Sequence, residues 1–400
     1  MQRSLRARPQ GRLSTQDPLR VVVSLQGRFH GFNLAAELHR QGMLLRLMTS
    51  QPRSRPEAFG VPREKVCATI RYDVLQRVVA RLGLLDRIPH LWHLSYEAFD
   101  RAVARRLEPA DLVVAWSGMA LHTHRRARQL GARTVVERGS SHIAFQRDIL
   151  EEEQRRWGLR GPAPVDPWAV EKELREYAEA DAIAIPSGFV RRSFVSRGVP
   201  ESRLLQVPYG VDLREFRPAP KQTPGFRAIF VGALSLRKGI PDLLEAAKRA
   251  QVELWLVGPR QSEVEPFLQR YAGHYEHKGS IPQSRLPGYY AQADVFVIAS
   301  IEEGLAMVIP QALACGLPVI CTANSGGDDL VRDGVNGFVV PIRDPDALAE
   351  RLAALRDDPD RLAAMKRAAV ESVAHGHGWR DYGLAIAARY RALAAEAARS

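Results

Sequence analysis

Length and composition describe a globular protein made of more than one folded unit. The chain has 400 residues, of which 46% are hydrophobic and 26% charged, which excludes a disordered or fibrous protein and exceeds the usual size of a single core. Its net charge of +12 attracts nucleic acid, anionic lipid and anionic substrates alike. The three cysteines have no paired spacing, so we expect neither a disulfide framework nor a zinc site, and a reducing cytoplasm is the natural compartment.

The first residues predict a tail followed by a strand and a helix. Residues 1–18 carry arginines without the apolar segment of a secretory signal, so we expect a disordered basic tail. Aliphatic residues from Leu19 to Leu25 predict a strand, and helical spacing from Phe32 to Arg40 predicts a helix. The loop between them contains Gly27 and Gly31 but lacks the GxGxxG fingerprint, which argues against an NAD site. A plain tight turn would account for both glycines.

A basic, partly apolar segment follows the second predicted strand, Leu44 to Ser50. From Tyr72 to Leu107 the spacing is helical and arginine is abundant. Such a helix either lies on an anionic membrane surface or is the solvated face of a core helix. No run approaches ~20 consecutive apolar residues, so any membrane contact is expected to be peripheral. No nucleic-acid-binding motif accompanies the basic residues, so nothing but charge supports a nucleic acid partner.

Short apolar strands then alternate with helices to the end of the chain. They lack polar alternation, as expected for parallel strands covered by helices on both faces, and they predict the α/β class. Three prolines between residues 218 and 224 form a stiff linker that divides two such units. The predicted strands are Asp111 to Ser117, Ala132 to Glu137, Ala182 to Pro186, Phe226 to Val231, Val252 to Gly258, Asp294 to Ser300 and Leu317 to Cys321.

The stretch from Asp294 to Cys321 has the best-defined ligand-binding pattern. It consists of a strand, a loop with Glu303 and Gly304, a short helix and a second strand. In an open α/β sheet ligands bind at the carboxyl ends of the strands, where the N-terminus of the following helix favours phosphate. An acidic residue in such a loop suits sugar hydroxyls. The stretch therefore predicts a site for a phosphorylated sugar.

The residues of this stretch resemble the nucleotide-sugar signature of retaining glycosyltransferases of family four, which have the two-domain GT-B fold. The resemblance implies that Glu303 contacts the donor sugar and that Gln311 takes the place of the glutamate that holds the nucleotide ribose. Gln311 keeps an acceptor oxygen but loses charge assistance. The residues that carry the resemblance are Glu303, Gly304, Leu305, Ala306 and Met307, with Ala314 to Ile320 downstream.

A second motif, Gly232 to Gly239, resembles the family's phosphate-binding loop. The family has an arginine and a lysine here that grip the donor diphosphate; this chain keeps Lys238 but has Ala233 at the arginine position. Either Arg237 supplies the missing charge, or Lys238 acts alone. The resemblance thus implies a donor phosphate site with one altered cation.

In the first half the resemblance is weaker. Many family members place a histidine beside the transferred sugar after the strand that corresponds to Ala132 to Glu137; His142 is the nearest candidate, but this position could instead fall on Arg138. A structural histidine is equally compatible with the sequence. In GT-B enzymes the loop that corresponds to Gly27 and Gly31 faces the cleft, near the donor phosphates and the acceptor.

The resemblance implies a retaining transferase that moves a sugar from a nucleoside diphosphate to a hydroxyl of a glycan or lipid-linked acceptor. Glu303, Lys238 and His142 are then the candidate catalytic residues, and no metal or other cofactor is expected. The implied setting is cell-envelope polysaccharide or glycolipid synthesis, in the cytoplasm or at the inner face of the plasma membrane. The implied domains are residues 19–214 for the acceptor and 215–376 for the donor, with residues 377–400 packed back on the first domain.

Two other functions fit the same fold. A catalytically silent binding or scaffold protein is suggested by Gln311, Ala233 and Tyr209, which replace the family's usual residues. A sugar-nucleotide epimerase or phosphorylase would act on the donor without an acceptor. Nucleotide-sugar binding without turnover would favour the silent protein.

Overall fold

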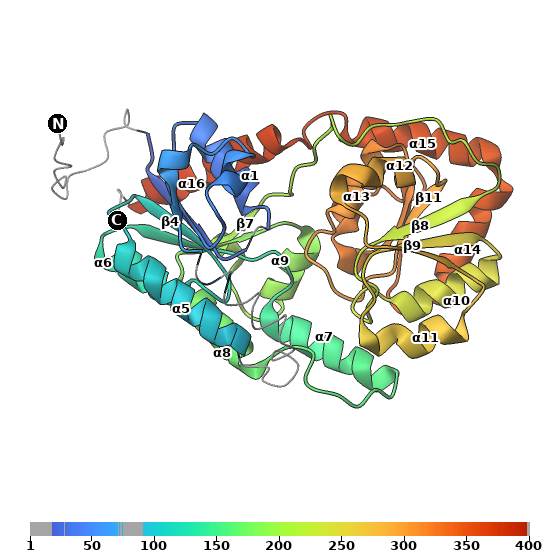
Figure 1. The fold of residues 1–400 in the computed structure, drawn as a ribbon, viewed down its shortest axis with the longest axis horizontal. Coiled ribbons are helices and arrows are strands. Elements are labelled where there is room, and N and C mark those ends of the chain that lie inside the picture. Colours follow the sequence, from blue (N-terminus) through green and yellow to red (C-terminus); the bar gives the residue numbers. More distant parts are fainter. Residues whose placement is uncertain (1–17, 28, 71, 73, 75–90, 398–400) are drawn as a thin grey trace.

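Two parallel β-sheets organise the protein, one in each half of the chain (Figure 1). The computed structural model describes residues 18–27, 29–70, 72, 74 and 91–397. Within them, seven strands form the first sheet in the order β3-β2-β1-β4-β5-β6-β7, and six form the second in the order β10-β9-β8-β11-β12-β13. The two orders are alike about β1 and β8, so the two halves are both Rossmann-like units.

The elements of the first half have the following bounds: β1 Val21–Leu25, α1 Gly31–Arg40, β2 Leu44–Thr49, α2 Ser54–Glu57, β3 Val66–Ala68, α5 Leu91–Arg106, β4 Leu112–Trp116, α6 Leu121–Gln129, β5 Arg133–Glu137, α7 Ile143–Arg156, α8 Pro167–Glu179, β6 Ala182–Ile185, α9 Gly188–Val195 and β7 Leu204–Gln206. Those of the second half are β8 Arg227–Val231, α10 Ile240–Ala250, β9 Glu253–Val257, α11 Glu265–Arg270, β10 Glu276–Gly279, α12 Leu286–Tyr290, β11 Val295–Ile298, α13 Val308–Ala314, β12 Val319–Thr322, β13 Gly337–Val340, α14 Pro345–Asp357, α15 Pro359–Val373 and α16 Trp379–Ala397.

Continuous apolar runs form the central strands of both sheets. Every residue of β1, β4 and β8 is buried. In the first sheet Val23 lies opposite Leu47 of β2 and Val114 of β4, so aliphatic side chains stack across neighbouring strands. Helices cover both faces, which explains why these strands show no polar alternation.

The C-terminal helix α16 crosses back to the first half, where Figure 1 shows it beside α1. The contact is close at Gly383, because a Cβ atom there would lie 2.4 Å from Cβ of Glu37. The Gln41 amide also donates to the Gly383 carbonyl at 2.8 Å. Where the chain crosses between the halves, Val211 donates to the His377 carbonyl at 2.8 Å, so the two connecting segments lie side by side.

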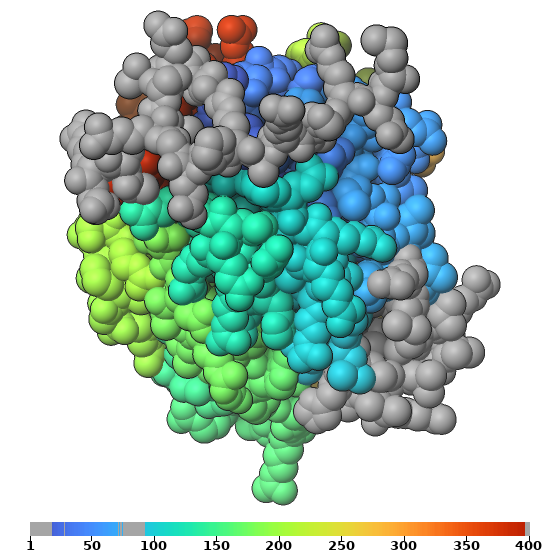
Figure 2. Space-filling model, turned by 90° about the vertical axis from the view of Figure 1, so that its left-hand side faces the viewer, coloured from blue at the N-terminus to red at the C-terminus, as the bar shows by residue number. Residues whose placement is uncertain are grey.

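Most predicted strands are confirmed with ends shifted by one or two residues, whereas several short elements were not predicted. They include β3, β7, α11 and the helix α2, the last of which lies where the prolines predict a loop. Of the basic helix predicted from Tyr72 to Leu107, α5 accounts for the last part, and residues 71, 73 and 75–90 lie outside the described residues. Figure 2 faces the first half, and blue to green residues make up most of the coloured surface in this view.

None of the described helices combines the length and the apolar character needed to cross a bilayer.

Candidate functional site

Two loops at the carboxyl ends of β8 and β11 meet where the two halves touch. Because these strands are neighbours in a parallel sheet, the loop with Arg237 and Lys238 lies against the loop with Glu302 and Glu303. The backbone joins the loops through Ile301, whose N–H donates to the Arg237 carbonyl at 2.9 Å. Two cations and two carboxylates thus gather at one edge of the second sheet.

Lys238 and Glu303 form a direct ion pair in this group. The ammonium contacts Oε2 of Glu303, and each side chain is 16% exposed. Burial and the nearby Arg237 guanidinium lower the pKa of Lys238 to about 7, while Glu302 acts in the opposite sense. The contact with the Glu303 carboxylate also favours the ammonium form. A phosphate that takes Lys238 has to replace this carboxylate.

Glu302, which sequence reasoning did not single out, is fully buried and bound from both halves. Its carboxylate accepts hydrogen bonds from Ser141 N–H at 2.9 Å, Ser141 Oγ at 2.6 Å and Gln146 Nε2 at 2.8 Å, all from the first half. From the second half, Arg237 Nε donates to it at 2.7 Å. Burial alone would raise the pKa of Glu302, but Arg237 and the bonds from Ser141 and Gln146 lower it to about 2.

At Gly304 the backbones of the two halves approach each other closely. A Cβ atom at this position would lie 1.7 Å from the Gly139 carbonyl oxygen, so only glycine fits here. The Gly304 carbonyl accepts a hydrogen bond from Ser187 Oγ at 2.6 Å. The next two residues of the predicted donor loop, Leu305 and Ala306, are each only 4% exposed and pack in the core.

Of the two candidates for the family's histidine position, Arg138 lies nearer the charged group. Its guanidinium is buried, pairs with Glu173 at 2.8 Å and donates to Gln146 Oε1 at 2.8 Å. Gln146 in turn donates to Glu302, so Arg138 supports the interdomain carboxylate through one intervening side chain.

His142 takes a structural position. Its Nδ1 accepts a hydrogen bond from the Ala144 N–H at 3.2 Å and so caps α7. The ring packs against Tyr177 and Phe194, with centroid separations of 5.2 and 5.0 Å. Burial, and then the cations Arg138 and Arg197, lower the pKa of His142 to about 4, so the ring is neutral near pH 7.

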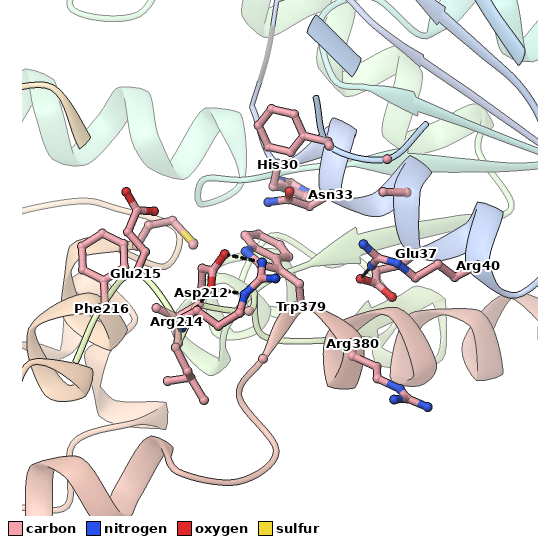
Figure 3. A pocket seen from close by; sticks show the side chains of 18 of the residues that line it. His30, Asn33, Glu37, Arg40, Asp212, Arg214, Glu215, Phe216, Trp379 and Arg380 are labelled. Atoms are coloured by element: carbon pink, nitrogen blue, oxygen red, sulfur yellow. Dashed lines mark hydrogen bonds and ion pairs between the residues drawn. The ribbon is translucent and has the colours of Figure 1, made fainter. Parts of the chain in front are cut away.

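A pocket of about 1160 Å³ opens between the halves beside these loops (Figure 3). The second half lines it with Gln283, Met307 and Gln311, and the first half with residues of the loop before α1 and of α1 itself. Gln311, to which the resemblance assigns the ribose contact, lines this pocket; it is 7% exposed, and its Oε1 accepts a hydrogen bond from the Tyr290 hydroxyl at 3.5 Å. The Lys238–Glu303 pair does not line this pocket in the structure.

The two glycines of the first loop have separate structural tasks. Gly27 has φ 90°, a backbone conformation that favours glycine, and its N–H donates to Ser50 Oγ at 3.2 Å. Gly31 begins α1, where a Cβ atom would lie 2.5 Å from Leu25 Cδ1. Neither glycine lines the pocket, but Phe29 and His30 between them do.

His30 forms a second unpredicted feature of the site. Its Nε2 lies 2.8 Å from Oε1 of Glu137, which is 2% exposed, and its ring stacks on Tyr209 at 4.0 Å between centroids. Figure 3 shows His30 next to Asn33, and Trp379 lines the same pocket. The available signal was topological, since His30 follows β1 and Glu137 ends β5 at the same edge of the first sheet.

One cluster in the described residues has the composition of a metal site. Glu97, Asp100 and His122 offer ligand atoms within 4.8 Å of one another. The ammonium of Lys172, however, lies 2.6 Å from Glu97 Oε2 and 3.3 Å from Asp100 Oδ2. A protein cation already balances these carboxylates, so the cluster is an ion-pair network.

The fold identifies a class of proteins when it is compared with solved structures. A sucrose-phosphate synthase from Thermosynechococcus elongatus superposes with a TM-score of 0.66 at 19% identity, and covers 94% of this chain and 100% of its own. The Anabaena protein HepE, crystallised with UDP and glucose, gives a TM-score of 0.67 at 17% identity with the same coverages. Together with the two Rossmann-like sheets, these likenesses confirm the predicted GT-B fold.

Family models assign the chain more closely. Residues 29–215 match the model described as glycosyltransferase family 4, and residues 213–372 match glycosyl transferases group 1. The two matches together span most of the chain. The protein therefore belongs to the group 1 and family 4 glycosyltransferases, as the residues around Glu303 predicted.

Relatives with assigned names share part of the chain. A D-inositol 3-phosphate glycosyltransferase of Thermobispora bispora is 33% identical over 207 residues, which cover 45% of this chain and 48% of the relative. A GDP-mannose-dependent phosphatidylinositol monomannoside mannosyltransferase of Mycolicibacterium smegmatis is 29% identical over 235 residues (52% and 62%). WcaL of Escherichia coli, a proposed colanic acid biosynthesis glycosyltransferase, is 30% identical over 196 residues (44% and 48%). These matches span only about half to three fifths of the relatives' own length.

Proposed function

We propose that the protein transfers a sugar from a nucleoside diphosphate sugar to a hydroxyl acceptor with retention of the anomeric configuration. The observation that carries the proposal is the meeting of Lys238, Arg237 and Glu303 at the carboxyl ends of two neighbouring strands. Two cations suit a diphosphate, and a carboxylate suits sugar hydroxyls. HepE, which has the same fold, was crystallised with UDP and glucose.

Donor binding exchanges the ion pair between Lys238 and Glu303 for contacts with the donor. A phosphate oxygen takes the ammonium of Lys238, and a hydroxyl of the sugar takes the Glu303 carboxylate. The bond between the anomeric carbon and the phosphate oxygen then breaks, and the electron pair leaves with the diphosphate. Lys238 and Arg237 stabilise that growing charge, which is an electrostatic contribution to catalysis. The acceptor oxygen bonds to the anomeric carbon on the same face, and its proton passes to the leaving phosphate.

For the acceptor we propose the wall that the first half contributes to the pocket. There His30, oriented by Glu137, and Asn33 offer polar side chains, while Trp379 of α16, which also lines the pocket, offers an aromatic face for a sugar or polyol ring. The names of the relatives include transferases to inositol 3-phosphate and to a phosphatidylinositol mannoside. A glycan or lipid-linked acceptor in cell-envelope synthesis is accordingly the acceptor class that we propose.

We also propose peripheral contact with an anionic membrane on the cytoplasmic side. Helix α5 exposes Leu94, which is 65% accessible, and the cations Arg101, Arg105 and Arg106. Leu94, Arg101 and Arg105 fall on one stripe of the helix by their spacing. Co-sedimentation with phosphatidylglycerol vesicles, but not with phosphatidylcholine vesicles, is the expected result; equal recovery from both would contradict the proposal.

A thermal-shift screen with UDP, GDP, ADP, dTDP and their sugar conjugates tests the donor site. A ligand that binds only the native state raises the apparent stability by mass action, so one nucleotide class should raise the melting temperature. The shift should be smaller in Lys238→Ala. No shift with any nucleotide would contradict the proposal, and binding without sugar transfer would favour the silent-scaffold function that Gln311 and Ala233 suggest.

A further inference from the structure

Glu302 joins the two halves through one buried carboxylate. It stands immediately before Glu303, and its side chain is 0% exposed. Oε1 accepts two hydrogen bonds from Ser141, and Oε2 accepts one from Gln146 and one from Arg237. Ser141 and Gln146 belong to the first half and Arg237 to the second. The carboxylate therefore has its full set of partners only when the halves are in contact, because Ser141 and Gln146 come from the other half.

Arg237 is held by this carboxylate at the edge of the candidate phosphate site. Besides its 2.7 Å bond to Glu302, its guanidinium donates to Ser140 Oγ at 3.1 Å and lies 3.6 Å from Glu303 Oε1. The side chain remains 34% exposed, so it is not sealed in the interface. Ala233, at the position where related enzymes have arginine, cannot provide this charge.

We propose that Glu302 is a positioning residue that aims Arg237 at the donor diphosphate when the two halves close. This inference rests on the proposed donor site. When the halves separate, the Glu302 carboxylate loses its hydrogen bonds from Ser141 and Gln146 and keeps only the one from Arg237. The Arg237 guanidinium then pairs with Glu302 alone and is not available to a phosphate. When they close, the first half satisfies part of the carboxylate, and Arg237 can share its remaining donors with the ligand.

A role confined to holding the halves together is the competing explanation, and the chain offers a control for it. Asp242 of α10 is also a buried interdomain carboxylate, 2% exposed, and Arg156 of α7 donates to its two oxygens at 2.7 and 2.8 Å. Neither Asp242 nor Arg156 contacts Arg237 or Lys238 in the described contacts. Asp242→Asn therefore weakens the interface without touching the phosphate site.

The readout is the preference for a nucleoside diphosphate over the matching monophosphate, measured by calorimetry with UDP against UMP and GDP against GMP. A misdirected Arg237 should weaken diphosphate binding by about tenfold and leave monophosphate binding nearly unchanged. We expect this result in Glu302→Gln and, at about threefold, in Ser141→Ala, which removes only one hydrogen bond. Asp242→Asn should keep the wild-type preference.

Arg237→Met completes the test. It should lose the same diphosphate preference, and adding Glu302→Gln to it should cause no further loss, because the two residues act as one unit. An unchanged preference in both Glu302→Gln and Ser141→Ala, or equal losses for mono- and diphosphate, would overturn the inference. If the wild-type protein itself does not prefer the diphosphate, the proposed donor site fails instead, so the two failures are distinguishable.

Discussion

Removing the ammonium of Lys238 should damage turnover more than donor binding. In the free protein this ammonium already contacts Glu303, and both side chains are largely buried. A hydrogen bond to a charged group contributes about 1.5–3 kcal/mol, but the donor phosphate only replaces the existing carboxylate partner, so we expect the lower end of this range. For Lys238→Met we therefore predict a loss of about tenfold in nucleoside diphosphate affinity.

Turnover depends on charge that develops as the diphosphate leaves. Removal of one preorganised group that stabilises such charge typically costs about 3 kcal/mol, so the rate constant for transfer in Lys238→Met should fall by roughly 100-fold or more. Calorimetry with the preferred nucleoside diphosphate measures the first quantity, and single-turnover kinetics with the corresponding nucleotide sugar measures the second.

Lys248→Met is the matched control, because Lys248 lies on the exposed side of α10 with its ammonium 5.7 Å from the centre of the Tyr271 ring. It should leave affinity and turnover within about twofold of wild type. If Lys238→Met also stays within that margin for both quantities, Lys238 does not hold the donor phosphate and the reasoning is refuted.

Replacing His30 with asparagine removes the ring held by Glu137, so the KM for the acceptor should rise by about tenfold while the affinity for the donor is unchanged. Steady-state kinetics with varied acceptor measures this KM, and an unchanged value would exclude His30 from the acceptor site. Gly304→Ala inserts a Cβ atom against the Gly139 carbonyl and should push the halves apart, which X-ray scattering in solution detects as a larger radius of gyration; an unchanged radius would contradict the close packing. Gln311→Glu restores a carboxylate for the ribose and should tighten the binding of the nucleoside diphosphate by about fivefold, but not the binding of its 2′-deoxy analogue. An equal gain in affinity for the nucleoside diphosphate and its 2′-deoxy analogue would show that Gln311 does not face the ribose. Burial lowers the pKa of His142 to about 4, whereas the unfolded chain has a pKa of about 6.5 at this residue. The neutral ring therefore contributes fully to the free energy of unfolding above pH 6.5, and as the pH falls toward 4 up to about 3 kcal/mol of that free energy is lost. Urea unfolding at pH 7.5 and 4.5 should show a smaller loss in His142→Gln than in wild type, and an equal loss would contradict the burial of a neutral ring.

The class of fold followed directly from the sequence because buried parallel strands leave a simple pattern. Runs such as Leu112–Trp116 and Val295–Ile298 are apolar at every position, and the structure buries them completely. The short edge strands β3 and β7 are only partly buried and three residues long, so they carry too little hydrophobic pattern to predict.

The two loops that carry Lys238 and Glu303 could be found in the sequence because the residues of each are consecutive or nearly so. Glu303 and Gly304 form a local motif, and Lys238 is part of a second one. Their meeting requires only that two neighbouring strands end at the same edge of a sheet.

The interdomain contacts could not be predicted in this way. Ser141 and Glu302, which are hydrogen-bonded to each other, are 161 residues apart in the sequence, and the His30–Glu137 pair is 107 residues apart. Such pairs depend on how the halves close and on how the first sheet is ordered. Likewise, His142 and Arg138 are four residues apart, and only the direction of α7 turns His142 into the core and leaves Arg138 next to Gln146.

The most direct test of the central claim is the fate of the donor. The nucleotide sugar identified by thermal shift should be incubated with the protein and with acceptors extracted from cell envelopes, with phosphorus NMR to follow release of the nucleoside diphosphate and proton NMR to read the anomeric configuration of the product. The account predicts release of the nucleoside diphosphate together with a glycosylated product in which the anomeric configuration of the donor is retained, and an at least 100-fold slower release in Glu303→Gln. Binding of the donor with no release of nucleoside diphosphate by the wild-type protein, or release that is equally fast in Glu303→Gln, would contradict it.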